Sequence, residues 1–168
     1  MSDPAADGVS AEAVPPAGAP PPAIPQEPVR WLGIDPGAVR VGIAACDPEE
    51  RLAVPIEVVP AMAAFPAIRA IARREGVGGI VVGLPRSLDG SEGFAAIAAR
   101  KLGERLRRLG LPLEYEDERL TSVAAEREAP RGAEVDDVAA ALMLQQFIDR
   151  RRRARGGSIA GRDLDAPA

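Results

Sequence analysis

The segment Gly79–Gly83 (GIVVG) constrains the fold of this chain more than any other stretch. It is an uninterrupted apolar run, and such runs are typical of strands that are buried on both faces of a parallel sheet. Parallel strands are joined by long crossover connections, which are usually helices. The segment therefore predicts an α/β domain in which helices cover the sheet.

The patterns on either side of this run predict the other elements. Three short apolar segments precede it, at 31–35, 40–47 and 52–59, and each is followed or separated by turn residues. Apolar residues at helical spacing predict helices over 62–75 and 91–109, and in the second we expect Phe94, Ile97, Leu102, Leu106 and Leu109 to share the core-facing side. A last strand is predicted at 111–116, then one helix that begins near Thr121 and one over 135–150. We expect a mixed five-stranded sheet: an antiparallel meander extended by parallel strands, with helices on its faces.

Both ends of the chain differ in composition from its centre. Residues 1–28 are rich in Pro, Ala, Gly and Glu, and they carry too few large apolar side chains to offset the entropy of ordering them. Residues 151–168 begin with a run of arginines and lack apolar periodicity. We expect two disordered tails around one domain at 29–150. The arginine run is either a phosphate-contacting arm or the solvated end of a helix, where it complements the helix dipole.

Composition excludes several kinds of chemistry. The chain has no histidine, so a Ser-His-Asp triad, a His-liganded zinc site and an imidazole base are ruled out. The single cysteine, Cys46, permits no intrachain disulfide and fits a reducing compartment, so we expect a cytoplasmic protein. The longest apolar stretch, 77–85, is shorter than the roughly 18 residues that a membrane helix needs. The net charge of −4 by itself gives no indication of nucleic acid.

Acidic residues lie at the carboxyl ends of predicted strands and at the start of the final predicted helix. Asp35 closes the first strand, Asp117 and Glu118 close the last, and Asp136 and Asp137 begin the final helix. Open α/β sheets bind ligands at the carboxyl ends of their strands. Clustered carboxylates repel one another unless cations lie between them, so we expect Mg²⁺ or Mn²⁺ there, and two such ions about 3.5–4 Å apart hydrolyse phosphodiesters. Taken singly, each acid also fits a turn, a surface ion pair or a helix N-terminus.

Four segments resemble, in order and spacing, the motif blocks of the YqgF family, also called the RuvX or pre-16S rRNA nuclease family. They are GIDPGAVRVGIAACD (33–47), IVVGLPRSLDGSEG (80–93), EDERLTSVAAE (116–126) and VDDVAAALMLQQFID (135–149). The resemblance covers 29–150 and neither tail. It implies the ribonuclease H-like fold of the RuvC resolvases, with strand order 3-2-1-4-5.

The same resemblance implies a function and a set of site residues. It implies a metal-dependent nuclease that matures the 5′ end of pre-16S rRNA. The alternatives are a Holliday junction resolvase in DNA recombination and repair and a non-catalytic nucleic-acid-binding factor in transcription. Asp35, Asp136 and one of Asp117 and Glu118 are the implied catalytic acids. We favour Glu118 over Asp117, so the predicted ligands of two Mg²⁺ or Mn²⁺ ions are Asp35, Glu118 and Asp136.

Arginines are the expected phosphate contacts, because Lys101 is the only lysine. Beside the predicted site the candidates for binding substrate are Arg40, Arg86, Ser87, Arg119 and Arg131. The loop 128–134 contains one basic residue, Arg131, whereas family members commonly carry a Gly- and Lys-containing loop there. Basic stretches also lie on the helices predicted at 62–75 and 91–109. Because aromatic residues are few, we expect the protein to recognise structured RNA or branched DNA through the nucleic-acid backbone. We expect it to act as a monomer or a homodimer.

Overall fold

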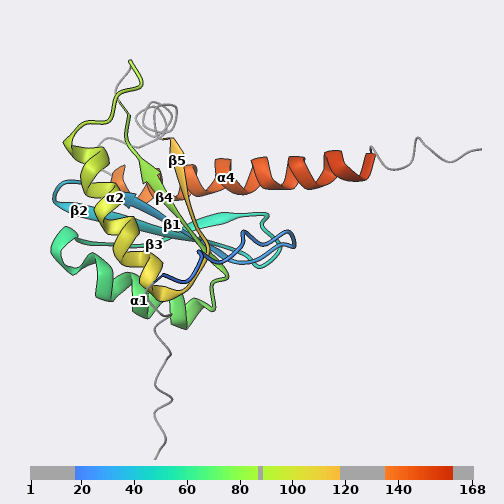
Figure 1. Ribbon diagram of the computed structural model, residues 1–168, viewed down its shortest axis with the longest axis horizontal. Coiled ribbons are helices and arrows are strands. Elements are labelled where there is room, and N and C mark those ends of the chain that lie inside the picture. The colour runs from blue at the N-terminus through green and yellow to red at the C-terminus, as the bar shows by residue number, and fades with distance from the viewer. Residues whose placement is uncertain (1–17, 87–88, 118–134, 161–168) are drawn as a thin grey trace, which may run out of the picture.

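The computed structural model of the chain describes residues 18–86, 89–117 and 135–160, with side chains in the last range from 138 to 156. Figure 1 shows a twisted sheet with helices on both sides. The elements are β1 (Trp31–Pro36), β2 (Arg40–Cys46), β3 (Ala53–Pro60), the short 3₁₀ helix η1 (Ala61–Ala63), α1 (Ala64–Glu75), β4 (Gly79–Leu84), α2 (Phe94–Leu106), the 3₁₀ turn η2 (Arg107–Leu109), β5 (Leu113–Asp117) and α4 (Val135–Ala160).

The five strands form one mixed sheet in the order β3-β2-β1-β4-β5. Pairing is antiparallel from β3 through β2 to β1, and parallel from β1 through β4 to β5. All six residues of β4 are buried, as its apolar run predicts, because helices cover both of its faces. The expected mixed five-stranded sheet and its strand order 3-2-1-4-5 are confirmed.

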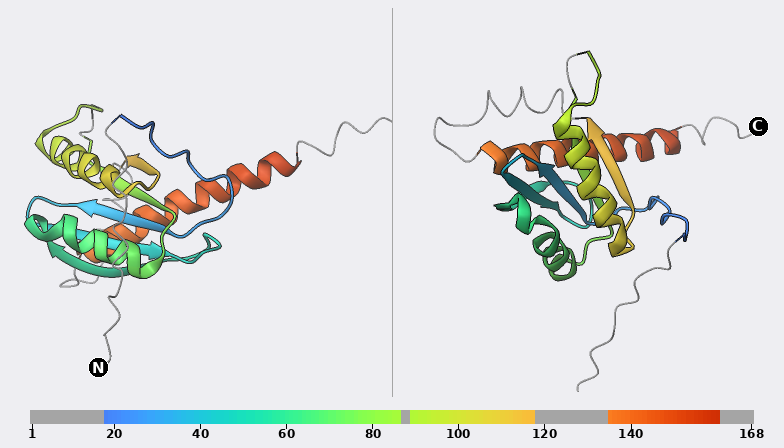
Figure 2. Two further views of the ribbon diagram at one scale, coloured as in Figure 1. Left: turned by 60° about the horizontal axis from the view of Figure 1, so that its bottom comes forward. Right: turned by 60° about the vertical axis from the view of Figure 1, so that its left-hand side comes forward.

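The helices divide between the two faces of the sheet, as both views in Figure 2 show. On one face α1 and α2 cover a cluster that includes Leu32, Ile34 and Val82. On the other face α4 lies alone over a second cluster, where Trp31 and Phe147 meet edge to face with ring centroids 4.8 Å apart. Side chains alternate between faces along each strand. The cluster to which a strand residue belongs therefore shows which face of the sheet it occupies.

The helix predicted over 91–109 differs from the observed one in its start and its buried side. Regular helix begins at Phe94, with Gly93 as N-cap, and its first side chain is 93% exposed rather than in the core. The buried positions are the small residues Ala96, Ala99 and Gly103, followed by Leu106. The reason lies in β5: a Cβ on Gly103 would stand 2.2 Å from the hydroxyl oxygen of Tyr115, so α2 approaches the sheet through its small side chains.

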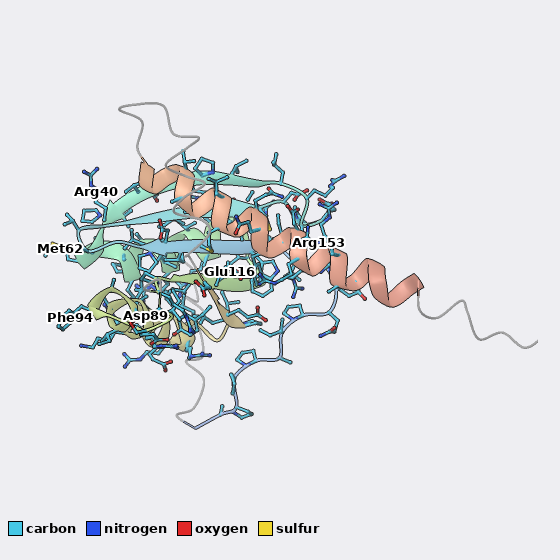
Figure 3. The ribbon with its side chains drawn as sticks, turned by 90° about the horizontal axis from the view of Figure 1, so that it is seen from above. Arg40, Met62, Asp89, Phe94, Glu116 and Arg153 are labelled. Carbon is cyan, nitrogen blue, oxygen red and sulfur yellow. The ribbon has the colours of Figure 1, made fainter. Side chains whose placement is uncertain are left out.

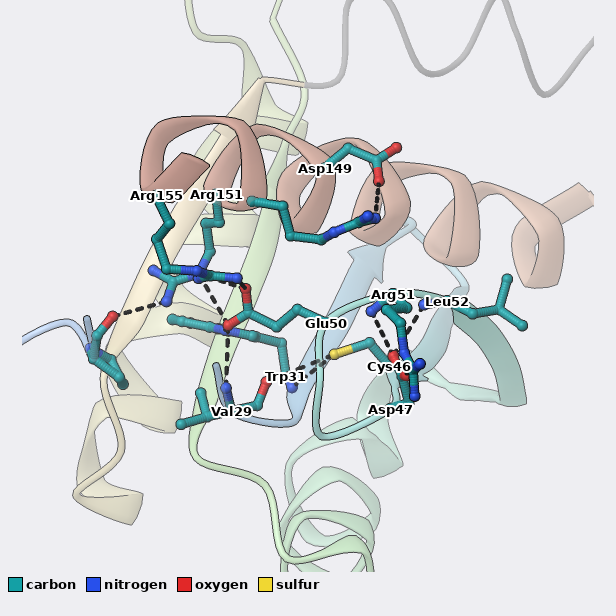
Figure 4. A network of polar contacts seen from close by, with 12 residues as sticks. Val29, Trp31, Cys46, Asp47, Glu50, Arg51, Leu52, Asp149, Arg151 and Arg155 are labelled. Atoms are coloured by element: carbon teal, nitrogen blue, oxygen red, sulfur yellow. Dashed lines mark hydrogen bonds and ion pairs between the residues drawn. The ribbon is translucent and has the colours of Figure 1, made fainter. Parts of the chain in front are cut away.

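The expected disordered tail from residue 151 is wrong for its first part, because α4 continues to Ala160. The extension is held by Glu50, a fully buried carboxylate in the turn between β2 and β3. Arg155 and Arg151 both pair with this carboxylate, at 2.7 and 3.2 Å, and Arg151 also lies over the Trp31 ring (Figure 4). The helix is stabilised beyond residue 150 because Arg151 and Arg155 offset the charge of the buried Glu50 carboxylate. Residues 161–168 lie outside the described residues.

The N-terminal boundary at residue 28 also falls inside ordered structure. Ile24 packs against the α4-side cluster, and the carbonyl oxygen of Pro25 accepts a hydrogen bond of 2.7 Å from Arg151. Residues 1–17 lie outside the described residues. In the part of the chain that the structure describes, none of the helices combines the length and the apolar character needed to cross a membrane.

Candidate functional site

Asp35 stands at the carboxyl end of β1, on the face of the sheet that α4 covers. Trp31 and Gly33 share this face with it through strand alternation: Trp31 packs on Phe147, and a Cβ on Gly33 would stand 2.8 Å from Cβ of Leu144. The Asp35 side chain is half-buried. The sequence places this acid correctly at a strand end, and the fold adds the information that it faces the helix.

The sheet surface on both sides of Asp35 carries no side chains. On β2 its partner in the register is Gly42. On β4 the register that joins Ile34 to Val82 brings Gly83 level with Asp35. Among the described residues, no group donates a hydrogen bond to the Asp35 carboxylate or pairs with it. A carboxylate without a cation, bordered by two glycines, leaves room for a ligand beside it.

The acids of β5 fall on opposite faces. Glu116 is in register with Gly83, so it lies on the α4 face in the same row as Asp35, and Arg150 of α4 holds it with contacts of 2.6 and 2.5 Å. Asp117 points to the α1 and α2 face and lies 3.9 Å from Arg86. The structure therefore does not bring Asp117 together with Asp35. Glu118 lies outside the described residues.

The first turn of α4 lies at the same end of the sheet as Asp35. Along α4, Phe147 packs on Trp31, whereas Leu144 and Ala140 lie over Gly33, so the helix runs opposite to β1. Continued backwards, this path leads the helix toward the carboxyl end of β1, where Figures 1 and 2 show it beginning. Asp136 belongs to this first turn, as the sequence predicts. Its side chain lies outside the described ones.

Two of the predicted phosphate-binding arginines are described. Arg40 begins β2, is exposed, and shares the α4 face with Gly42 by strand alternation; Figure 3 shows it near the start of α4. Arg86 follows β4 and lies between two acids, with its side chain 3.7 Å from Glu92 and 3.9 Å from Asp117. The other three candidates for binding substrate, Ser87, Arg119 and Arg131, lie outside the described residues.

The loop between β4 and α2 is organised by its acids. Arg100 donates two hydrogen bonds to Glu92, at 2.8 and 2.5 Å, and these bonds lower the pKa of the Glu92 carboxyl. The Asp89 carboxylate accepts a hydrogen bond of 2.9 Å from the backbone N–H of Ser91, which lowers its pKa as well. Glu92 thus links Arg86 to α2. The ion pair with Glu92 therefore restrains the side chain of Arg86, the arginine beside the candidate site.

Four of the five arginines at positions 150–155 pair with acidic residues, so these four do not form a free phosphate-contacting arm. Arg150 pairs with Glu116, Arg151 and Arg155 pair with Glu50, and Arg152 pairs with Asp149. Trp31 donates a further hydrogen bond of 2.9 Å to Glu50 through its indole N–H (Figure 4). Glu50 also adopts a left-handed φ of 55°, a strained conformation for a residue with a side chain. The sequence offered no signal for this buried acid, because a Pro-Glu-Glu turn is typical of the surface.

The described residues contain no cluster of three or more acids, cysteines or histidines that would bind a metal ion. Of the three predicted ligands, Asp35 has a described side chain, whereas those of Glu118 and Asp136 lie outside the described part. Sequence reasoning also passed over Glu116. The available signal is its position two residues before the favoured acid Glu118, because residues two apart share a face in a regular strand.

Comparison with known proteins places the chain in a family. A family model described as "RuvX: Holliday junction resolvase" matches residues 29–150. A protein of Thermosynechococcus vestitus is 39% identical over 144 residues, covering 79% of this chain and 95% of its own length, and one of Chloroflexus aggregans is 41% identical over 133 residues, covering 72% and 94%. Both bear the name "Putative pre-16S rRNA nuclease". The RuvC protein of T. thermophilus, solved with a Holliday junction substrate, aligns with a TM-score of 0.48 at 19% identity, covering 74% of this chain and 96% of RuvC. From the family match and the proteins of T. vestitus and C. aggregans, we conclude that the chain belongs to the RuvX family.

Proposed function

We propose that this protein is a metal-dependent nuclease of the cytoplasm that hydrolyses phosphodiesters in structured RNA and matures the 5′ end of pre-16S rRNA. The observation that carries the proposal is the setting of Asp35. Its carboxylate lies at the carboxyl end of β1, between Gly42 and Gly83, and no described cationic group pairs with it. The names of the relatives support the choice of RNA substrate.

The donor set suits a hard divalent cation. Asp35, Glu118 and Asp136 would hold two Mg²⁺ or Mn²⁺ ions, since carboxylate oxygens are the ligands that these ions prefer. Continued alternation along β5 favours Glu118 over Asp117, because Glu116 is on the α4 face and Asp117 is not. When bound, such ions activate a water molecule and offset the charge of the phosphate.

The chain's own cationic groups have separate roles in this proposal. Arg40 is exposed on the same face as Asp35 and would hold a substrate phosphate there. Arg86 would contact the next part of the strand from its position between Glu92 and Asp117. Arg150 would act as a positioning residue, because it draws the negative charge of Glu116 toward α4 and away from the phosphate.

The test uses an RNA that joins the 5′ leader of the precursor to the start of 16S rRNA. The purified chain with Mg²⁺ or Mn²⁺ is expected to remove the leader, and a chelator is expected to stop it. Asp35→Asn, Glu118→Gln and Asp136→Asn are expected to reduce cleavage to background. The matched control is Asp117→Asn, which makes the same chemical change to the neighbouring acid, on the face of the sheet opposite Asp35, and it is expected to retain most of the activity. Equal cleavage by wild type and the three acid variants would refute the mechanism.

The second candidate function is resolution of Holliday junctions, and the description of the matching family favours it. A four-way DNA junction should therefore be incubated in parallel under the same conditions. Cleavage of the junction with no removal of the RNA leader would replace the proposed substrate by branched DNA. Binding of either substrate without cleavage, under every metal condition, would instead support a non-catalytic role.

A further inference from the structure

Two arginines from different helices share one aromatic ring on the face of the sheet opposite α4. The Cζ atom of Arg105, in α2, lies 4.8 Å from the centre of the Phe65 ring, and that of Arg69, in α1, lies 6.0 Å from it. Phe65 is itself fixed, because it packs partly buried against the α1 and α2 core. We call this group the Phe65 cluster. Both arginines are exposed, and their guanidinium groups, which carry equal charge, contact the same ring.

No acid offsets this charge within the described residues. The helices α1 and α2 together contain two acidic residues, and both are engaged elsewhere: Glu75 pairs with Arg30 and Arg74, and Glu104 pairs with Arg107. Arg69 and Arg105 have no carboxylate partner among the described residues. This situation contrasts with Arg150, Arg151 and Arg155 of α4, which pair with the buried acids Glu116 and Glu50. Two like charges kept together without a counter-charge favour an anion from outside.

The Phe65 cluster lies close to the candidate catalytic edge. Ala61, four residues before Phe65, donates a backbone hydrogen bond of 2.9 Å to the carbonyl oxygen of Val39. Val39 belongs to the hairpin that follows Asp35 and leads into β2. Residues 61–63 form η1 and α1 begins at Ala64, so these four steps span about 6–8 Å. The cluster is therefore one helical turn from the loops that border Asp35, around the edge of the sheet.

We propose that the Phe65 cluster is a second phosphate-binding site, which grips the phosphodiester backbone of a double-helical part of the substrate next to the segment at Asp35. The proposal rests on the proposed function for the identity of the substrate. Guanidinium groups suit this role, because each presents a planar set of donors to phosphate oxygens. The ring holds both groups in place before binding, which reduces the entropy lost when they close on the backbone. Contacts to phosphate carry no sequence information, so the site recognises charge and shape rather than base sequence.

The test measures binding of a short fluorescein-labelled RNA duplex to the full chain in the presence of a chelator, so that cleavage does not interfere. The double variant Arg69→Ala/Arg105→Ala is expected to raise the Kd about tenfold or more at low salt, and to reduce the slope of log Kd against log salt by about 1.8, the value for two lost phosphate contacts. The control is Arg51→Ala/Arg153→Ala, which removes two exposed arginines outside α1 and α2 and is expected to change neither quantity by more than a small amount.

The variant Phe65→Leu tests the role of the ring. It keeps an apolar side chain in the core and both charges, so the salt slope is expected to stay as in wild type, while the Kd rises about threefold because the guanidinium groups lose their support. The same measurements with a DNA duplex show whether the site binds the phosphate backbone alone. An equal loss of affinity for DNA and for RNA supports this interpretation. An arm with a polyglutamate peptide tests an acidic protein as partner. Loss of peptide binding with RNA binding unchanged would overturn the proposal.

The outcome separates this inference from the proposed function. Equal Kd values for the Arg69→Ala/Arg105→Ala variant and its control would overturn the inference, even if the wild-type chain cleaves precursor RNA. A loss of duplex binding in that variant would support it, even if the wild-type chain cleaves nothing.

Discussion

Arg150 and Glu116 join the last helix to the last strand through a two-pronged ion pair, with N to O distances of 2.6 and 2.5 Å. Glu116 is only 8% exposed, whereas the side chain of Arg150 is 55% exposed. Hydrogen bonding to Glu116 raises the pKa of the Arg150 guanidinium further above its already high value. Because one partner is largely out of water, the pair matters more than a typical surface ion pair.

Replacing Arg150 by Met, which keeps an apolar stem, is expected to leave Glu116 buried and unpaired. We expect the free energy of unfolding to fall by about 1–2 kcal/mol, the lower part of the usual range, since Arg150 is half exposed. Urea denaturation measures it. Arg153→Met, at an exposed position of the same helix, is the control and should be near neutral. The double variant Arg150→Met/Glu116→Gln should regain part of the loss, and failure to do so would contradict the explanation.

Glu50 makes stability depend on pH. Burial alone would raise the pKa of its carboxyl, but hydrogen bonds from Arg155, the Val29 N–H and Trp31 outweigh burial and hold that pKa below its ordinary value of 4.5. A carboxyl with a lowered pKa in the folded state contributes stability above its ordinary pKa, and this contribution is lost as the pH falls toward the folded value.

We therefore expect wild type to exceed Glu50→Gln in free energy of unfolding by a full, constant margin at neutral pH, and by a shrinking margin below about pH 4.5. Urea midpoints of both proteins across this range measure the margin. Glu49→Gln changes the neighbouring carboxyl, whose side chain is 61% exposed, and should show no comparable trend. A margin for Glu50→Gln that stays constant into acid would be evidence against the buried ion pairs.

Gly33 sets how closely α4 approaches the sheet. An added Cβ would stand 2.8 Å from Cβ and 3.3 Å from Cδ2 of Leu144, so Gly33→Ala must push the helix outward. We expect a loss of about 1–3 kcal/mol in stability, as in other overpacked cores. Cleavage should fall as well, because α4 carries Asp136 in its first turn. Gly156→Ala is the matched control: its Cβ meets nothing within 4 Å, so the same change should stabilise the helix slightly.

Cys46 is expected to be unreactive in the folded protein. Its side chain is 3% exposed, and burial raises the pKa of the thiol to about 11, so little thiolate forms at pH 8. Ellman's reagent should label the native chain only at the rate of unfolding, and should label it at once in denaturant. Leu52→Cys, at a position 61% exposed, supplies a thiol that should react promptly in the native state. Prompt labelling of native wild type would show that the strand opens easily.

Several features of the fold and site follow from local sequence. The apolar run of β4 predicts a strand covered on both faces, and all its residues are buried. The turn of Pro and Gly after Asp35 predicts that this acid lies at a strand end, and it does. The motif blocks, taken in order, implied the strand order that the sheet has. These features depend on residues close together in the chain or on a pattern shared by a family.

The sequence by itself determined the element types, the strand-end position of Asp35 and the exclusion of imidazole chemistry. Only the tertiary structure decided which side chains meet. It placed Asp117 on the face opposite Asp35, exposed Phe94, turned Arg150 and Arg151 inward onto Glu116 and Glu50, and brought Arg69 and Arg105 to one ring. The physical reason is that periodicity specifies alternation within one element, whereas the partner of a side chain depends on strand register and on how closely two elements pack.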